Sequence, residues 1–314
     1  MNELEQATRQ AVAAWSPETE LDRAQAERAT SSWRLFWREF RKHRLALAGS
    51  VVVAALVVVA LAAPWIAPHD PTQINPFRRL QPPAWMPGGS WEHPLGTDHL
   101  GRDILSRIIY GSRVSLAVAA VVVLVATTVG VVMGLVSGFF GGWVDAVIQR
   151  VVETLLAFPY LVLALALMGV MGPGLMNLFI ALVYKEWVTS ARVVRAEVLA
   201  VKNREFVEAA RALGASRLRI MFRHILPNVL ASAVVIGTLR VAWVILMEAS
   251  LSFLGLGVQP PTPSWGVMVA DGRGAIFQQW WISTFPGLAI LVTVLAVNLV
   301  GEGLRDALDP RLRE

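Results

Sequence analysis

Residues 114–136 read VSLAVAAVVVLVATTVGVVMGLV, a stretch without a single charged side chain. About 20 apolar residues in a helix are enough to cross the hydrocarbon core of a bilayer. Five more apolar stretches lie on either side of it, so we predict an all-α polytopic membrane helical bundle with six transmembrane helices. The expected spans are 45–66, 114–136, 144–171, 175–188, 229–247 and 285–300.

The composition of the whole chain agrees with a membrane protein. Of its 314 residues, 55% are hydrophobic and 16% are charged, whereas soluble domains carry roughly 25% charged residues. The net charge of +5 is better explained by basic cytoplasmic loops than by nucleic-acid binding. The expected environment is therefore the lipid bilayer, and no nucleic-acid partner is expected. The absence of cysteine excludes disulfides and thiol chemistry.

Basic residues predict the orientation of the chain. Eight lysines and arginines precede the first span, and nine lie between Lys185 and Arg223. Because such clusters stay on the cytoplasmic side, and six crossings place both clusters on one side, we expect cytoplasmic N- and C-termini. The expected N-terminal segments are a polar extension at 1–32, an interfacial amphipathic helix at 33–44 and the first transmembrane helix at 45–66. The polar extension lacks the apolar core of a secretion signal. An extracytoplasmic loop at 67–113, a core domain at 114–300 with a cytoplasmic loop at 189–228, and a cytoplasmic tail at 301–314 follow.

A glycine repeat marks one face of the second span. Gly130, Gly134, Gly138 and Gly142 occur at every fourth position. Small residues at this spacing let two membrane helices approach closely. Plain helix packing and a flexing role both fit the pattern.

The sequence contains no enzyme signature. None of the three lysines follows a glycine, so the phosphate-binding loop G-x-x-x-x-G-K-[ST] is absent. The five histidines lie outside the apolar stretches, and no H-E-x-x-H occurs. We therefore expect no catalytic, cofactor-binding or metal-binding residues, and no ATP hydrolysis by this chain alone.

Two ionisable residues belong to the fifth apolar stretch. Glu248 follows Arg240 by eight residues, about 80° around a helix with 3.6 residues per turn, so both can face the bundle interior. Charged groups at membrane depth are costly and mark functional candidates. Arg240 and Glu248 either line a polar translocation path or have a structural role. In the structural alternative they form an ion pair, or the arginine side chain extends toward the membrane surface.

Residues 205–228 read EFVEAARALGASRLRIMFRHILPN and predict two short helices that meet at a tight turn. Gly214 suits the left-handed conformation that ends a helix. Ser216 suits the N-cap of the next helix. The result is a compact, charged knob that fits a groove on a cytoplasmic partner.

The run Glu208-Ala209-Ala210, with Gly214 four residues on and Ile225-Leu226-Pro227 further along, resembles the EAA loop of inner-membrane permeases in binding-protein-dependent ABC importers. Two further stretches are similar to the dipeptide and oligopeptide permeases, and to their C-type subunit in particular. They are HPLGTDHLGRD at 93–103, and LSFLGLG at 251–257 followed by QPPTPSWG at 259–266. The resemblance extends from about Trp33 to Pro310.

The resemblance implies a type I ABC importer permease fold and a non-catalytic subunit. It implies as partners a B-type permease, an extracytoplasmic substrate-binding protein and two cytoplasmic ATPase subunits, which bind ATP and Mg²⁺. It places the chain in the cytoplasmic (inner) membrane of a bacterium or archaeon. Dipeptides or oligopeptides are the expected substrates, and nickel or another small solute is the alternative within the class. A secondary transporter without an ATPase is the alternative from another class.

The resemblance also implies roles for particular residues. The expected ATPase-coupling residues are Glu205, Glu208, Ala209, Ala210, Arg211, Gly214 and Arg217. Asp98, Arg102 and Asp103 are either paired with one another or contact the binding protein. Arg240 and Glu248 remain the candidates for the translocation path.

Overall fold

The computed structural model describes residues 37–308. The expected N-terminal extension, the start of the interfacial helix and the end of the C-terminal tail lie outside these residues. The elements are α3 (Arg44–Ile66), the 3-10 turn η1 (Pro76–Arg78), α4 (Ile104–Phe140), α5 (Gly142–Ala157), α6 (Tyr160–Met171), α7 (Leu175–Val201), α8 (Glu205–Ala212), α9 (Arg217–Arg219), the π-helical turn η2 (Ile220–Ile225), α10 (Leu226–Phe253), α11 (Trp265–Gly272), the 3-10 turn η3 (Arg273–Ala275) and α12 (Trp281–Leu308). The described part of the chain holds no β-strand, which confirms the all-α prediction.

Four helical segments are long and apolar enough to cross a membrane. They are α3, α4, the continuous run from α9 through α10, and α12. The pair α5 and α6 passes only as a unit, and its two helices are bent by 90°. The expected span at 144–171 is therefore not one continuous helix, because Pro159, the N-cap of α6, disfavours helical geometry in Phe158, where the backbone is extended. The described residues thus give four or five candidate spans, not six.

Several helices continue beyond their apolar stretches. α4 begins ten residues before the expected span, because the Asp103 side chain caps it by accepting a hydrogen bond from Ser106 N. The outer loop is correspondingly shorter than 67–113. α7 runs through to Val201, so the first part of the expected loop at 189–228 is helical. α12 continues to Leu308, through much of the expected tail. Hydropathy marks the lipid-facing part of a helix, whereas capping decides where the helix stops.

Close backbone packing joins α4 to α7, and the glycine stripe explains it. A Cβ atom at Gly134 would lie 2.5 Å from Ala191 O, and one at Gly130 would lie 2.6 Å from Trp187 O. Gly138 similarly meets Val198. The packing interpretation of the repeat is therefore confirmed for three of the four glycines. Gly142 differs, because it has a φ of +55° at the start of α5 and open space around it.

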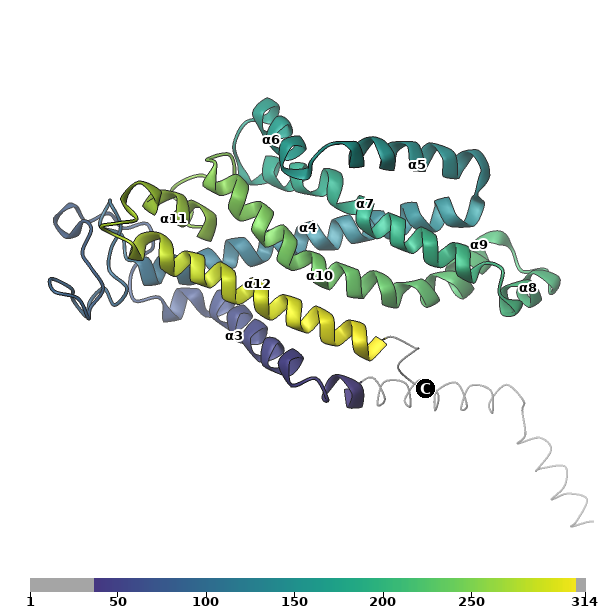
Figure 1. Ribbon diagram of the computed structural model, residues 1–314, viewed down its shortest axis with the longest axis horizontal. Helices are drawn as coiled ribbons and strands as arrows, with labels where there is room; N and C mark the ends of the chain where they lie inside the picture. The colour runs from purple at the N-terminus through teal and green to yellow at the C-terminus, as the bar shows by residue number, and fades with distance from the viewer. Residues whose placement is uncertain (1–36, 309–314) are drawn as a thin grey trace, which may run out of the picture.

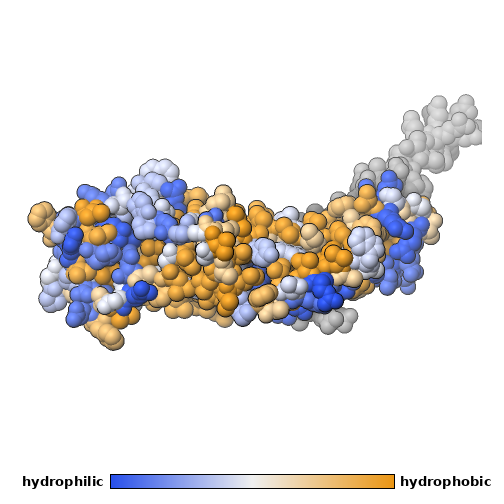
Figure 2. All heavy atoms as spheres, turned by 90° about the horizontal axis from the view of Figure 1, so that it is seen from above, coloured by the Kyte–Doolittle hydropathy of each residue, from blue (hydrophilic) through white to orange (hydrophobic). Residues whose placement is uncertain are grey.

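The molecule is elongated (Figure 1). One end carries the loop between α3 and α4 together with α11. The opposite end carries α8 and α9, and the start of α3 and the end of α12 lie in the same half of the molecule. Figure 2 shows an apolar belt around the middle and hydrophilic side chains toward both ends. The long axis of the bundle therefore lies across the membrane, and both ends of the described chain share one side with α8.

Candidate functional site

The short helix α8 forms a knob at one end of the bundle. Its inner face consists of Val207 and Ala210, which are 0% and 9% exposed. They join a buried cluster with Val201 from the end of α7 and with Met221 and Ile225 from η2. The knob is thus packed firmly on the two long helices that flank it in sequence.

The turn after α8 has the geometry that the sequence predicts. Gly214 has a φ of +79°, in the left-handed region. Ala215 N donates to Ala210 O at 3.1 Å, which closes the end of the helix. Ser216 Oγ accepts from Arg219 N at 3.3 Å and caps α9. Both local predictions are confirmed.

The outer face of the knob is polar and solvent-exposed. The exposed members of the predicted coupling set are Glu205, Glu208, Ala209, Arg211, Gly214 and Arg217. Ala210 differs from its neighbour Ala209, because its side chain lies in the packed cluster. The two alanines therefore differ in role. Ala209 contributes only a small side chain to the exposed face, and the small side chain of Ala210 allows α8 to pack closely against η2.

The knob is continuous with a long helix of the bundle. η2 leads directly into α10, with Pro227 in the first turn, where a proline is compatible with helix. π-helical turns are rare and often occur at functional sites. α8 is therefore connected to α10 both through η2 along the chain and through the shared buried cluster.

Arg240 lies on α10 and pairs with Glu186 of α7. Its Nε and Nη2 donate to the two carboxylate oxygens, with Nη2 2.8 Å from Oε2. Glu186 is 2% exposed at its side chain, and Arg240 is 25% exposed. The guanidinium also lies 5.3 Å from the centre of the Trp243 ring.

Glu248 does not pair with Arg240. Its side chain is fully buried and accepts hydrogen bonds from Ser115 Oγ of α4 at 3.1 Å and from Ser252 Oγ at 2.8 Å. The carboxyl group thus connects α4 to α10 at the end of the bundle that carries α11. Of the two path candidates, only Arg240 is partly exposed.

Asp98 and Arg102 belong to a four-membered ion cluster at the end of the bundle that carries α11. Arg102 Nε lies 2.7 Å from Asp98 Oδ2, and its Nη2 lies 3.2 Å from Asp271 Oδ2. Arg107 lies 3.5 Å from Asp98 and 3.3 Å from Asp271. Asp98 and both arginines are buried. The cluster fastens the loop between α3 and α4 to α4 and α11.

Asp103 stands apart from this cluster. Its carboxylate caps α4 and lies 3.0 Å from His93 Nδ1. Two groups of described residues have metal-ligand side chains close together. They are His69, His93 and Asp103, and Asp98, His99 and Asp271.

Sequence reasoning did not identify Glu186, Arg107 or Asp271. Glu186 lies within the expected span at 175–188. An acidic side chain inside an apolar span is the signal that could have identified it. Arg107 lies within the expected extracytoplasmic loop at 67–113, where a single arginine gives no local signal. Asp271 has no local signal, because its partner Arg102 lies 169 residues away.

Residues 130–314 match the family of binding-protein-dependent transport system inner membrane components. The chain belongs to this family of ABC importer permeases. Residues 31–83 also match the N-terminal transmembrane domain of oligopeptide transport permease C. The chain is therefore a non-catalytic, multi-pass permease subunit of the inner membrane, and partner ATPase subunits bind the ATP. This assignment excludes the alternative of a secondary transporter.

Relatives of this permease cover nearly its whole length. It is 51% identical to the dipeptide transport system permease protein DppC of Escherichia coli K12, over 89% of this chain and 93% of that protein. It is 45% identical to the di/tripeptide transport system permease protein DppC of Pseudomonas aeruginosa, over 88% and 92%. The glutathione transport system permease protein GsiD of Shigella flexneri is 45% identical, over 91% and 93%.

A solved structure supports the fold of the permease. A chain of the inward-facing MetNI methionine ABC transporter aligns with a TM-score of 0.55 and 17% identity, over 66% of this chain and 98% of that chain. The type I importer permease fold is thereby confirmed.

Proposed function

We propose that this permease is the C-type subunit of a peptide importer and forms half of a translocation path for dipeptides and oligopeptides. Its partners in this proposal are a B-type permease, two ATPase subunits on the cytoplasmic side and an extracytoplasmic substrate-binding protein. Support for the substrate class comes from relatives whose names specify dipeptide and di/tripeptide transport.

The observation that carries the proposal is the construction of the knob. α8 exposes a charged face while its inner face is locked to α7 and η2 by Val207 and Ala210. An ATPase that binds this face moves α10 together with α8. ATP-driven approach of the two ATPases then changes the access of the path by rigid-body motion of the helices.

In this proposal the chain crosses the membrane six times. The crossings are α3, α4, the bent pair α5 and α6, α7, α10 and α12. Five charged side chains lie along α7, among them Lys185, Glu186 and Arg192, and such charges are tolerated when they face protein or a polar path. With the knob in the cytoplasm, both termini are cytoplasmic and the loop between α3 and α4 is extracytoplasmic, in the inner membrane of a bacterium or archaeon.

A groove on α7 fits one wall of a path shared by two permeases. Its volume is about 590 Å³, and its lining includes Thr189, Arg192 and Glu197. Arg240 contacts the same helix through Glu186 and is our candidate for the path. Glu248 is fully buried, so we assign it to holding α4 against α10 beside the path.

The outer end is our candidate contact for the binding protein. Asp98, Arg102 and Asp103 are buried, so their contribution is to shape the loop between α3 and α4 that meets the partner. Arg78 and Glu92 form an exposed ion pair on that loop and are available for contact.

The docking assignment is tested by reversing one charge on the knob. Glu208→Lys, in the chain co-expressed with its partner permease, ATPases and binding protein, should abolish peptide uptake and loosen the ATPases during purification. Glu302→Lys is the matched control, because Glu302 is an exposed glutamate on α12, outside the knob. Normal uptake by Glu208→Lys would contradict the coupling role.

Substrate class is tested by ligand-stimulated ATP hydrolysis of the purified complex with its binding protein. We expect stimulation by dipeptides and tripeptides. Stimulation by glutathione alone, or by a nickel salt alone, would replace the peptide assignment with the corresponding solute. Failure of the ATPases to co-purify with the wild-type chain would overturn the proposed assembly.

A further inference from the structure

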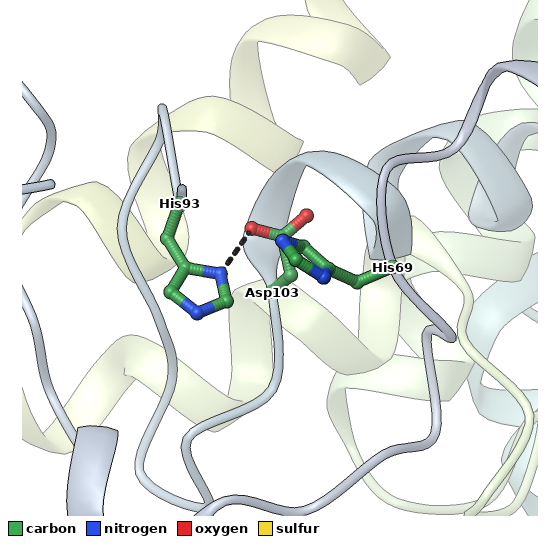
Figure 3. A group of neighbouring side chains, drawn as sticks. All are labelled: His69, His93 and Asp103. Carbon is green, nitrogen blue, oxygen red and sulfur yellow. Dashed lines mark hydrogen bonds and ion pairs between the residues drawn. The ribbon is translucent and has the colours of Figure 1, made fainter. Parts of the chain in front are cut away.

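Three side chains of metal-ligand type come from three separate segments and meet at the outer end (Figure 3). His69 follows α3, His93 lies in the loop before α4, and Asp103 is the cap of α4. A nitrogen from each histidine and a carboxylate oxygen of Asp103 all lie within 4.8 Å of one another. In Figure 3 both imidazole rings lie next to the Asp103 carboxylate, and a dashed line joins the carboxylate to His93.

The spacing of the donors is close to that of a small transition-metal site. Zinc binds nitrogen and oxygen at about 2.0–2.2 Å, so neighbouring ligands of a tetrahedral ion lie about 3.3 Å apart. His93 Nδ1 and Asp103 Oδ1 are separated by 3.0 Å. The third donor, on half-buried His69, borders an outer cavity of about 540 Å³. This cavity makes the His69 side of the group accessible from solvent.

The charge of Asp103 favours a cation at this position. The residue is 2% exposed, and within residues 37–308 no lysine or arginine forms an ion pair with it. Its Oδ2 accepts from Ser106 N at 2.8 Å and Ser106 Oγ at 2.7 Å, while Oδ1 faces His93. Buried carboxylates are normally paired with a cation or bound to a metal. A bound divalent ion would supply the missing positive charge.

Outer partners hold the donors in place. Ser106 Oγ, which binds Asp103, also accepts from the backbone N of His69 at 3.0 Å. His69 Nε2 lies 2.7 Å from the carbonyl oxygen of Glu92, the residue before His93. The two imidazole rings are 4.6 Å apart. Such surrounding hydrogen bonds orient metal-binding histidines and carboxylates.

We propose that His69, His93 and Asp103 bind one divalent transition-metal ion, with Zn²⁺ as the best match to two imidazoles and a carboxylate. The fourth position is open to water or to a group from a partner. The ion fastens the segment after α3 and the loop before α4 to the cap of α4. This inference departs from the sequence prediction of no metal-binding residues.

The second group, Asp98, His99 and Asp271, serves as the internal comparison. Its two carboxylates are already engaged by Arg102 and Arg107, so a metal there would have to displace two cations. His99 is exposed. We assign no metal to this group.

The test counts zinc in the assembled complex of the full chain with its partner subunits, in nanodiscs and with a histidine-free affinity tag. Complexes stripped with a chelator are dialysed against micromolar Zn²⁺ and analysed by elemental mass spectrometry. His69→Gln is the main variant, since the backbone contact of His69 to Ser106 does not need the imidazole. His99→Gln is the matched control.

We expect the wild type and His99→Gln each to bind one more Zn²⁺ per complex than His69→Gln binds. We also expect Zn²⁺ to raise the midpoint of thermal unfolding of the wild type and of His99→Gln but not that of His69→Gln. Equal zinc in wild type and His69→Gln would overturn the site. Loss of zinc in His99→Gln alone would also overturn it and point to the second group. If His69→Gln fails to assemble, cobalt substitution in the wild type decides. Tetrahedral Co²⁺ absorption supports the site, and its absence contradicts it.

Discussion

Arg240 on α10 donates two hydrogen bonds to the carboxylate of Glu186 on α7, across 54 residues of sequence. Glu186 is 2% exposed at its side chain. This pair joins the helix that continues from the knob to the helix that lines the proposed path. Its placement makes Glu186 dependent on Arg240 for charge compensation.

Removing one partner of this pair should be costly. Arg240→Leu leaves a buried carboxylate without its cation, and we expect a loss of about 3–5 kcal/mol of stability. The double variant Arg240→Leu with Glu186→Leu should recover most of that loss, because no charge is then left unpaired. Thermal unfolding of the complex in nanodiscs measures the three variants. Additive losses would show that the two residues act independently.

The same double variant tests the translocation role of Arg240. If it assembles normally and imports peptide with unchanged kinetics, the pair serves structure only. A changed KM for peptide in a stable double variant supports a position on the path.

Gly134 should tolerate no side chain. Gly134→Ala places a Cβ 2.5 Å from Ala191 O, so α4 and α7 must separate, at a cost of about 1–3 kcal/mol. Gly287→Ala on α12 is the control, since nothing lies within 4 Å of its added Cβ. Fluorescence-detected size exclusion after heating compares the folded fractions. Equal midpoints for the two variants would refute the close helix contact.

Asp98 should be sensitive to loss of charge even when its shape is kept. Asp98→Asn retains an acceptor for Leu100 N and Arg102 N, which lie 2.8 and 3.0 Å from Oδ1. The substitution removes the negative charge that compensates the buried guanidinium groups of Arg102 and Arg107. We therefore expect about 3–5 kcal/mol of local destabilisation. Hydrogen exchange over residues 67–103 should rise. Asp70→Asn, at an exposed aspartate that caps a local turn, should leave that exchange nearly unchanged.

The turn of the knob should depend on backbone conformation and not on space. Gly214 has a φ of +79°, and no atom lies within 4 Å of an added Cβ. Gly214→Val should therefore cost about 1–3 kcal/mol in strain and weaken ATPase co-purification. Gly214→Asn should be milder, because asparagine visits the left-handed region more readily. Equal co-purification by both variants would mean that the turn is not needed for docking.

Local features of this permease were predictable because they depend on neighbouring residues. The all-α class follows from apolar stretches, the end of α8 from Gly214, and the cap of α9 from Ser216. The glycine spacing on α4 predicted a close helix contact, although not its partner. The exposed knob was predictable for the same reason, since its charges and its turn lie within twelve residues of one another.

The sequence by itself therefore determined the membrane class, the likeness to ABC importer permeases and the local shape of the coupling knob. Only the tertiary structure decided the bend between α5 and α6, the pairing of Arg240 with Glu186, and the burial of Ala210 but not of Ala209. It also brought His69 to Asp103. Hydropathy, helix caps and turns act within a few residues, whereas these contacts join segments whose approach is set by packing of the whole bundle.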